Sequence, residues 1–192
     1  MNKLSGFILS VFVLVSCNDD YQPKPKGYLS LTYPNPIYEP VDVDCAYRFE
    51  KNKISIVQPS KSNQPCWINL EYPDLKGTLF LTYRPVKDNL RRLLIDAQRM
   101  PLEHTTKADQ IEGSSYINEV QKVYGTVYEI KGDAASQAQF YVTDSVNHFL
   151  TGAIYFKTAP NYDSILPAAD YLKRDMKHLV ESLQWKRNIT EN

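Results

Sequence analysis

Three histidines are the first candidates for chemistry, and His104 has the most acidic surroundings. It lies in the segment EHTTKAD, close to Glu103 and Asp109. A metal site on a helix needs a second ligand three or four positions away on the same face, and the residue four positions after His104 is Ala108. We therefore expect neither a metal site nor a cofactor, and we interpret His104 as a histidine at a helix end or at the edge of the core.

Asp144, Ser145 and His148 contain the residue types of a hydrolytic triad, but they lie together in one short stretch. Catalytic triads are assembled from separated segments that converge in space, and a serine in a hairpin turn has no oxyanion hole beside it. The sequence therefore predicts no catalytic residue and no enzymatic activity.

Tyrosines on the later predicted strands could line a groove for carbohydrate or peptide. They are Tyr124, Tyr128, Tyr141 and Tyr155. On alternating strands, tyrosines more often form the edge of a core. The alternative function is therefore a ligand-binding or enzymatic protein that acts on envelope glycan or peptide. It would act through these tyrosines or through His104 with Asp109.

Cys17 follows an apolar run from Leu4 to Val15, which is too short to span a membrane but has the length of a signal-peptide core. The stretch Leu14-Val15-Ser16-Cys17 resembles the bacterial lipoprotein box, in which the cysteine thiol is diacylated with chains such as palmitate. Two or three acyl chains suffice for stable membrane anchoring. We therefore expect residues 1–16 to be a lipoprotein signal peptide and Cys17 to be the lipidated residue; the competing interpretation is a plain secretory signal.

The remaining cysteines are Cys45 and Cys66. In an exported, oxidising compartment an even pair is expected to form a disulfide. Two buried free thiols are the alternative. A zinc site is less favoured because two thiolates without a nearby histidine do not complete a tetrahedral shell.

The composition fits one ordinary globular domain. Lys and Arg total 22 and Asp and Glu total 22. The chain therefore has no basic excess of the kind that would indicate nucleic acid binding.

After the signal peptide we expect a lipidated cysteine with an extended tether at 17–27, a single domain at 28–186, and a short tail at 187–192.

Alternating apolar and polar residues predict strands along much of the domain. The segments are 28–34, 46–50, 53–58, 66–72, 77–85, 122–132, 136–145 and 148–158. The last three are joined by short polar connections, which favours an antiparallel meander. Three prolines in 34–45 indicate an irregular loop.

Two longer helices are expected. Asp88 is predicted to cap the first, whose apolar positions reach Met100 before Pro101 ends it, and Lys107–Glu112 is predicted to add a turn or two before Gly113. The second is predicted to start near Ser164, with Pro167 in its first turn and an apolar stripe to Leu183. The fold class is therefore α+β, a mostly antiparallel sheet with two main helices packed on it.

The ordered segments resemble the gliding motility lipoprotein GldD family of the Bacteroidetes. The resemblance runs from the lipoprotein box to Trp185 and includes PKPKGY, CWINLEYP, GTLFLTYRPV, EHTTKAD, VYGTVYEIKGDAASQAQFYVTDS, HFLTGAIYF and HLVESLQWK. The ending, SLQW after three meandering strands, also resembles the Mog1 and PsbP α/β/α sandwich in fold.

The resemblance implies a cell-envelope protein of gliding motility and the associated type IX secretion machinery. It implies an assembly or adaptor role, a membrane anchor through the lipid, and other envelope proteins of that machinery as partners. It supplies no catalytic residue. The expected location is the exported side of a membrane, and Asp19 with Asp20 resembles the acidic export signal of surface lipoproteins.

Overall fold

The computed structural model describes residues 33–62, 64–158 and 161–186. Its strands are β1 (Tyr38–Val41), β2 (Tyr47–Asn52), β3 (Ile56–Pro59), β4 (Trp67–Tyr72), β5 (Gly77–Pro85), β6 (Ala108–Asn118), β7 (Val123–Gly132), β8 (Ser136–Thr143), β9 (His148–Phe156) and β10 (Gln184–Trp185). Its helices are α1 (Leu90–Arg99) and α2 (Tyr162–Ser182), with the 3-10 turns η1 (Pro73–Leu75) and η2 (Met100–His104).

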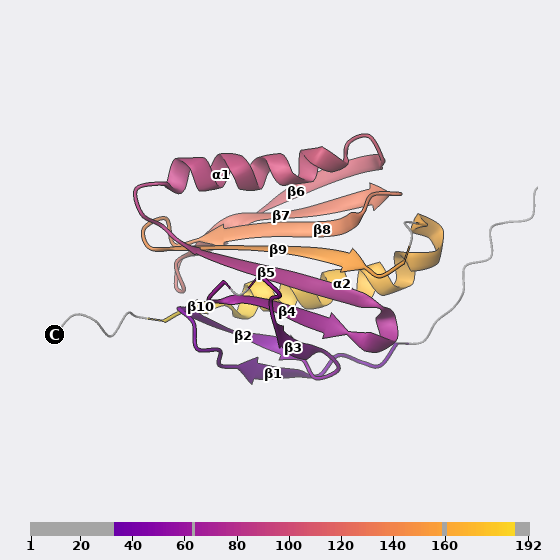
Figure 1. Ribbon diagram of the computed structural model, residues 1–192, viewed down its shortest axis with the longest axis horizontal. Helices are drawn as coiled ribbons and strands as arrows, with labels where there is room; N and C mark the ends of the chain where they lie inside the picture. The colour runs from indigo at the N-terminus through magenta and orange to yellow at the C-terminus, as the bar shows by residue number, and fades with distance from the viewer. Residues whose placement is uncertain (1–32, 63, 159–160, 187–192) are drawn as a thin grey trace, which may run out of the picture.

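The strands form two sheets (Figure 1). The large sheet has seven strands in the order β3-β4-β5-β9-β8-β7-β6, and the small sheet has three in the order β1-β2-β10. All pairs are antiparallel. The two halves of the large sheet meet where β5 pairs with β9, with Thr82 opposite Thr151.

The two helices cover opposite faces of the large sheet. Neighbouring residues on one strand point to opposite sides, and on β8 they pack with different helices. On β8, Phe140 and Val142 belong to the main core with α2 residues such as Leu172. Tyr141, between them, packs instead with Leu93 of α1. In Figure 1, α2 passes behind β5. The α+β class and the layering of helix, sheet and helix agree with the sequence prediction.

The meander predicted for the last three strands is confirmed as β7, β8 and β9. The strands predicted at 46–50, 53–58, 66–72 and 77–85 correspond to β2, β3, β4 and β5. The alternation in 77–85 places Leu79 and Leu81 on one face and Phe80 on the other, and in β5 both leucines are buried whereas Phe80 is 40% exposed.

The helical turn predicted at Lys107–Glu112 is wrong. This segment opens β6, which continues without a break past Gly113 to Asn118 and pairs with β7 along its length. A side chain at Gly113 would meet the ring of Tyr128 at 3.0 Å, so the glycine makes room for a cross-strand aromatic residue instead of ending a helix. Pairing with a neighbouring strand has overridden the local preference.

Three smaller expectations also need correction. Asn89, not Asp88, is the residue before α1, and Asp88 has a left-handed backbone with φ of 54°. The proline-containing loop at 34–45 includes the short edge strand β1, which tolerates Pro40. The last helix begins at Tyr162 after the cap Asn161, so Pro167 lies inside it and not in the first turn.

Candidate functional site

A disulfide joins Cys45 and Cys66, whose Cα atoms are 5.4 Å apart. It ties the residue two positions before β2 to the residue before β4, and so links the two sheets. The hydroxyl of Tyr47, which is fully buried, donates to the carbonyl of Cys66 at 3.0 Å. The predicted lipidation site, Cys17, lies outside the described residues, as do the signal peptide and the tether.

Asp144 and Ser145 form a hairpin turn and not part of a triad. One carboxylate oxygen of Asp144 accepts hydrogen bonds from the backbone N–H groups of Val146, Asn147 and His148, at 3.0, 2.8 and 2.8 Å. Burial tends to raise the pKa of Asp144, but these three donors outweigh it and hold the pKa below its ordinary value. The carboxylate is therefore occupied in shaping the turn between β8 and β9.

His148 is a core residue at the same end of the sheet. It is 5% exposed, and its ring stacks on Trp185 with centroids 5.1 Å apart. Burial lowers the pKa of His148, with Asp144 opposing part of the shift, which favours the neutral ring. In the tautomer protonated on Nε2, Nδ1 accepts the Tyr83 hydroxyl at 2.9 Å. Tyr83, His148 and Trp185 thus fasten β10 to the large sheet.

His104 likewise has a structural partner. Its Nε2 lies 2.9 Å from the side-chain nitrogen of Gln139 on β8. Burial lowers the pKa of His104, with Glu103 opposing part of the shift. A neutral ring protonated on Nδ1 accepts this hydrogen bond, which attaches η2 to the sheet. The sequence interpretation of His104 as a core-edge residue fits this position.

The four tyrosines do not line one groove. Tyr141 stacks on Phe149 beneath α1, and Tyr128 packs beside it with ring centroids 6.5 Å apart. Tyr124 donates to Glu119 at 2.8 Å on the surface near the β6–β7 turn. Tyr155 lies toward the other end of the sheet, edge-on to Phe80. Two are therefore core residues, and the other two are far apart on the strands.

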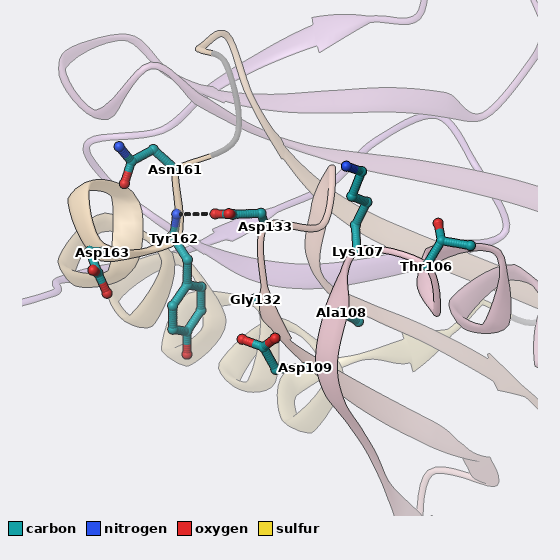
Figure 2. A pocket seen from close by; sticks show the side chains of 9 residues that line it. All are labelled: Thr106, Lys107, Ala108, Asp109, Gly132, Asp133, Asn161, Tyr162 and Asp163. Atoms are coloured by element: carbon teal, nitrogen blue, oxygen red, sulfur yellow. Dashed lines mark hydrogen bonds between the residues drawn. The ribbon is translucent and has the colours of Figure 1, made fainter.

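A polar hollow of about 550 Å³ lies at the beginning of α2 (Figure 2). Its lining comes from the start of β6, the β7–β8 turn and the first residues of α2, and comprises Thr106, Lys107, Ala108, Asp109, Gly132, Asp133, Asn161, Tyr162 and Asp163. Asp109 is thus at the hollow, but His104 is not part of its lining within the described chain. The proposed pairing of His104 with Asp109 does not form a site here.

Two of the polar side chains around this hollow, Asp133 and Asn161, have structural roles. Asp133 accepts the backbone N–H of Tyr162 at 2.8 Å, as Figure 2 shows, and the Asn161 side chain accepts from Ser164 at 3.3 Å. Both bonds satisfy donors that the first turn of a helix leaves unpaired. Gly132 has φ of 104°, and a side chain there would meet the backbone nitrogen of Asp109 at 2.6 Å. Across the described residues, no three His, Cys, Asp or Glu side chains are grouped to hold a metal ion.

Asp175, which the sequence analysis did not single out, is the most deeply placed acid of α2. It is 4% exposed, accepts the hydroxyl of Tyr38 at 2.8 Å on one oxygen, and accepts the side-chain amide of Asn52 at 2.9 Å on the other. Asn52 also donates to Tyr171 at 2.8 Å. Burial raises the pKa of Asp175, although hydrogen bonds from Tyr38, Asn52 and Tyr72 oppose the shift. The cluster joins β1, β2, β4 and α2.

A signal for this cluster is present in the sequence. Asp175 lies three residues after Leu172 and four before Leu179, so it falls on the apolar stripe of the helix. A carboxylate at such a position requires buried donors. The sequence does not show that they come from β1 and β2, more than a hundred residues earlier.

None of the helices in the described part of the chain combines the length and the apolar character that crossing a membrane requires.

Comparison with known proteins gives two findings. Residues 18–185 match the family described as Gliding motility lipoprotein GldD. Among solved structures, the chain is similar to the cyanobacterial PsbP protein, CyanoP, from Synechocystis sp. PCC 6803, at 10% identity and a TM-score of 0.47, covering 84% of this chain and 99% of that one. The curated proteins gave no match.

Proposed function

Because this chain belongs to the gliding motility lipoprotein GldD family, we propose that it is a lipid-anchored, non-catalytic assembly or adaptor component of gliding motility and of the associated type IX secretion machinery. The family itself places the chain among lipoproteins of the cell envelope. The secretion machinery as partner, the adaptor role and the lack of catalysis are the parts that we add.

The main support for a non-catalytic adaptor role is that the side chains that could be reactive make contacts within the protein itself. Asp144 holds a turn through three backbone donors, and His148 is stacked and buried between Tyr83 and Trp185. His104 bonds to Gln139. A general acid, base or nucleophile must instead reach a substrate. Each of these groups is directed at its own chain, which supports the non-catalytic part of the proposal.

The alternative, a protein that binds or processes envelope glycan or peptide, has weaker support. The tyrosines proposed for such a groove are divided between the core under α1 and distant surface positions. The hollow of Figure 2 is lined mainly by polar groups. One of the aspartates in this lining, Asp133, caps α2. Ligand binding there would have to proceed beside groups that already stabilise the helix start.

Crosslinking in living cells tests the adaptor role. A photo-reactive residue is placed at Val120, which is 87% exposed at the β6–β7 turn, or at Val146, which is 66% exposed at the β8–β9 turn. The control position is Lys157, whose side chain is 68% exposed just beyond β9. We expect gliding or secretion components among the products from at least one turn and not from the control. Purified envelope complexes that never contain this protein with such components would reject the proposal.

The membrane side requires a separate experiment. We propose that the chain acts on the exported side, tethered through residues 17–27, and the pair Asp19 and Asp20 makes surface display a specific alternative to a periplasmic position. Protease added to intact cells should degrade a surface-displayed domain and leave a periplasmic one intact. Permeabilised cells provide the control in which both are degraded.

A further inference from the structure

The edges of the two sheets are protected to very different degrees. An edge strand offers unpaired backbone groups to any other strand, and proteins commonly block it with short strands, proline, lysine or bulges. The edge strands β1 and β3 have four residues each and contain Pro40 and Pro59. The edge strand β6 has eleven residues and contains neither proline nor lysine. It is the longest and least protected edge strand of the described fold, since its one bulge lies at its start.

The second half of β6 is also exposed, and its pairing with β7 is regular. Gly113, Ser114 and Ser115 are exposed, and Ile117 is 68% exposed. The one irregularity in its pairing with β7 is a bulge between Ala108 and Gln110, so the ladder runs evenly from Gln110 to Asn118. Nine residues of regular strand extend about 30 Å. That length is enough for a strand of another chain to pair.

The sequence of this edge is complementary to itself. We propose that β6 pairs antiparallel with β6 of a second copy of this chain, in the register that places Ser114 opposite Ser114 of the copy. Opposite residues in an antiparallel pair lie on the same face and contact each other. In this register Ile111 faces Ile117, Glu112 faces Tyr116, and Gln110 faces Asn118, each pair occurring twice.

These pairs match in chemistry. The exposed side chain of Ile117 covers the half-buried side chain of Ile111, and the amides of Gln110 and Asn118 can exchange hydrogen bonds. Glu112 lies beside Lys131, with N and O atoms 3.7 Å apart, and accepts from Gln110. The Tyr116 hydroxyl accepts from Asn118 at 3.4 Å and retains its proton to donate to the carboxylate of the copy. Between Gln110 and Asn118 no two like charges face each other; the acids Asp109 and Glu119 face each other only beyond the ends of this regular ladder.

Neighbouring registers lack this match. Centring the pair on Ser115 places Ile117 opposite Gly113 and Ile111 opposite Glu119. Centring it on Gly113 places Ile111 opposite Ser115 and Ile117 opposite Asp109. Either shift puts an aliphatic side chain against a carboxylate, which loses both contacts. The Ser114-centred pair joins two seven-stranded sheets into one continuous sheet.

Site-specific oxidation of the full-length chain in its own membranes tests both the contact and its register. In Ser114→Cys the two thiols face each other across the axis, whereas in Ser115→Cys they are diagonal neighbours, too far apart for a relaxed disulfide. We expect at least about tenfold more disulfide-linked dimer from Ser114→Cys than from Ser115→Cys. Equal yields from the two variants, or no dimer from either, would overturn the proposal.

A charge at the axis provides a second measurement that needs no new thiol. Ser114→Lys places two ammonium groups opposite each other, and we expect it to weaken self-association of the detergent-extracted chain about three- to fivefold in sedimentation equilibrium. The matched control is Gln58→Lys on the other edge strand, β3, where Gln58 is also exposed. Unchanged association in Ser114→Lys, with the thermal midpoint of the wild type, would contradict the dimer.

Discussion

The hydroxyl of Tyr38 donates a 2.8 Å hydrogen bond to Asp175, which lies 137 residues later in the chain. The same tyrosine ring stacks on His178 with centroids 3.5 Å apart, and His178 contacts Glu50 at 2.8 Å. Through this one side chain, β1 near the start of the described domain is attached to α2 near its end. The bond connects the small sheet to the layer that covers the large one.

Tyr38→Phe should destabilise the domain by about 1.5–3 kcal/mol, because the phenyl ring keeps the stacking on His178 but removes a donor from a buried carboxylate. The free energy of unfolding in urea measures this change. Tyr124→Phe is the control, since its hydroxyl donates to the exposed Glu119 at the same distance of 2.8 Å. We expect less than about 0.5 kcal/mol there. Equal losses in the free energy of unfolding for the two variants would show that the buried hydrogen bond contributes no more than the exposed one.

Asp175 should make stability depend on pH in a direction opposite to that of most carboxylates. Burial raises its pKa in the folded state, so the folded protein holds this proton at a higher pH than the unfolded chain does. The ionised group therefore opposes folding above the folded pKa, and the stability returns as the pH falls through that pKa toward the ordinary Asp value.

The comparison with Asp175→Asn isolates this term, because the other titrating groups are common to both proteins. We expect the free energy of unfolding of the wild type, relative to the variant, to rise as the pH falls from neutral toward the ordinary Asp pKa of 3.8. Urea unfolding at several pH values measures it. A difference that stays constant or falls over this range would contradict the raised pKa.

Removing the disulfide should cost about 3 kcal/mol on the loop-closure account, because Cys45 and Cys66 are separated by 21 residues. The double variant Cys45→Ala, Cys66→Ala, unfolded in urea beside the wild type, measures this loss. Cys17→Ala is the matched control and should leave the unfolding midpoint unchanged. Free thiols at both positions, detected by alkylation and mass spectrometry of the wild type, would refute the bond itself.

Cys17→Ala should abolish acyl labelling and release the protein into the soluble fraction, because the thiol is the expected attachment point of the lipid. Radiolabelled fatty acid and membrane fractionation provide the two measurements. Persistence of the label in the variant would overturn the lipoprotein assignment of Cys17, whereas loss of label with retention at the membrane would indicate a second attachment.

Local periodicity was sufficient for elements whose own pattern separates a buried face from an exposed one. The alternation in 77–85 predicts both faces of β5, and the apolar stripe ending at Leu183 predicts α2. The bend of the chain into a meander follows from the short turns between β7, β8 and β9.

Distant partners decided the features that were missed. The local pattern of residues 107–112 favoured a helical turn, but pairing with β7 makes most of them strand. Asp175 is explained by Tyr38 and Asn52, which belong to the other end of the chain. For the candidate site the sequence located the cysteines, but the hollow of Figure 2 arises from three segments that meet only in the folded protein.

The junction of β5 with β9 also determines when this protein can fold. Thr82 and Thr151, opposite each other at the junction, are 69 residues apart, and the core needs α2, which follows later still. Closing so long a loop makes the pairing late and slow. A chain delivered through a membrane with its amino end first would present β5 with one open side until β9 arrived. A product cut short before β9 cannot complete the sheet.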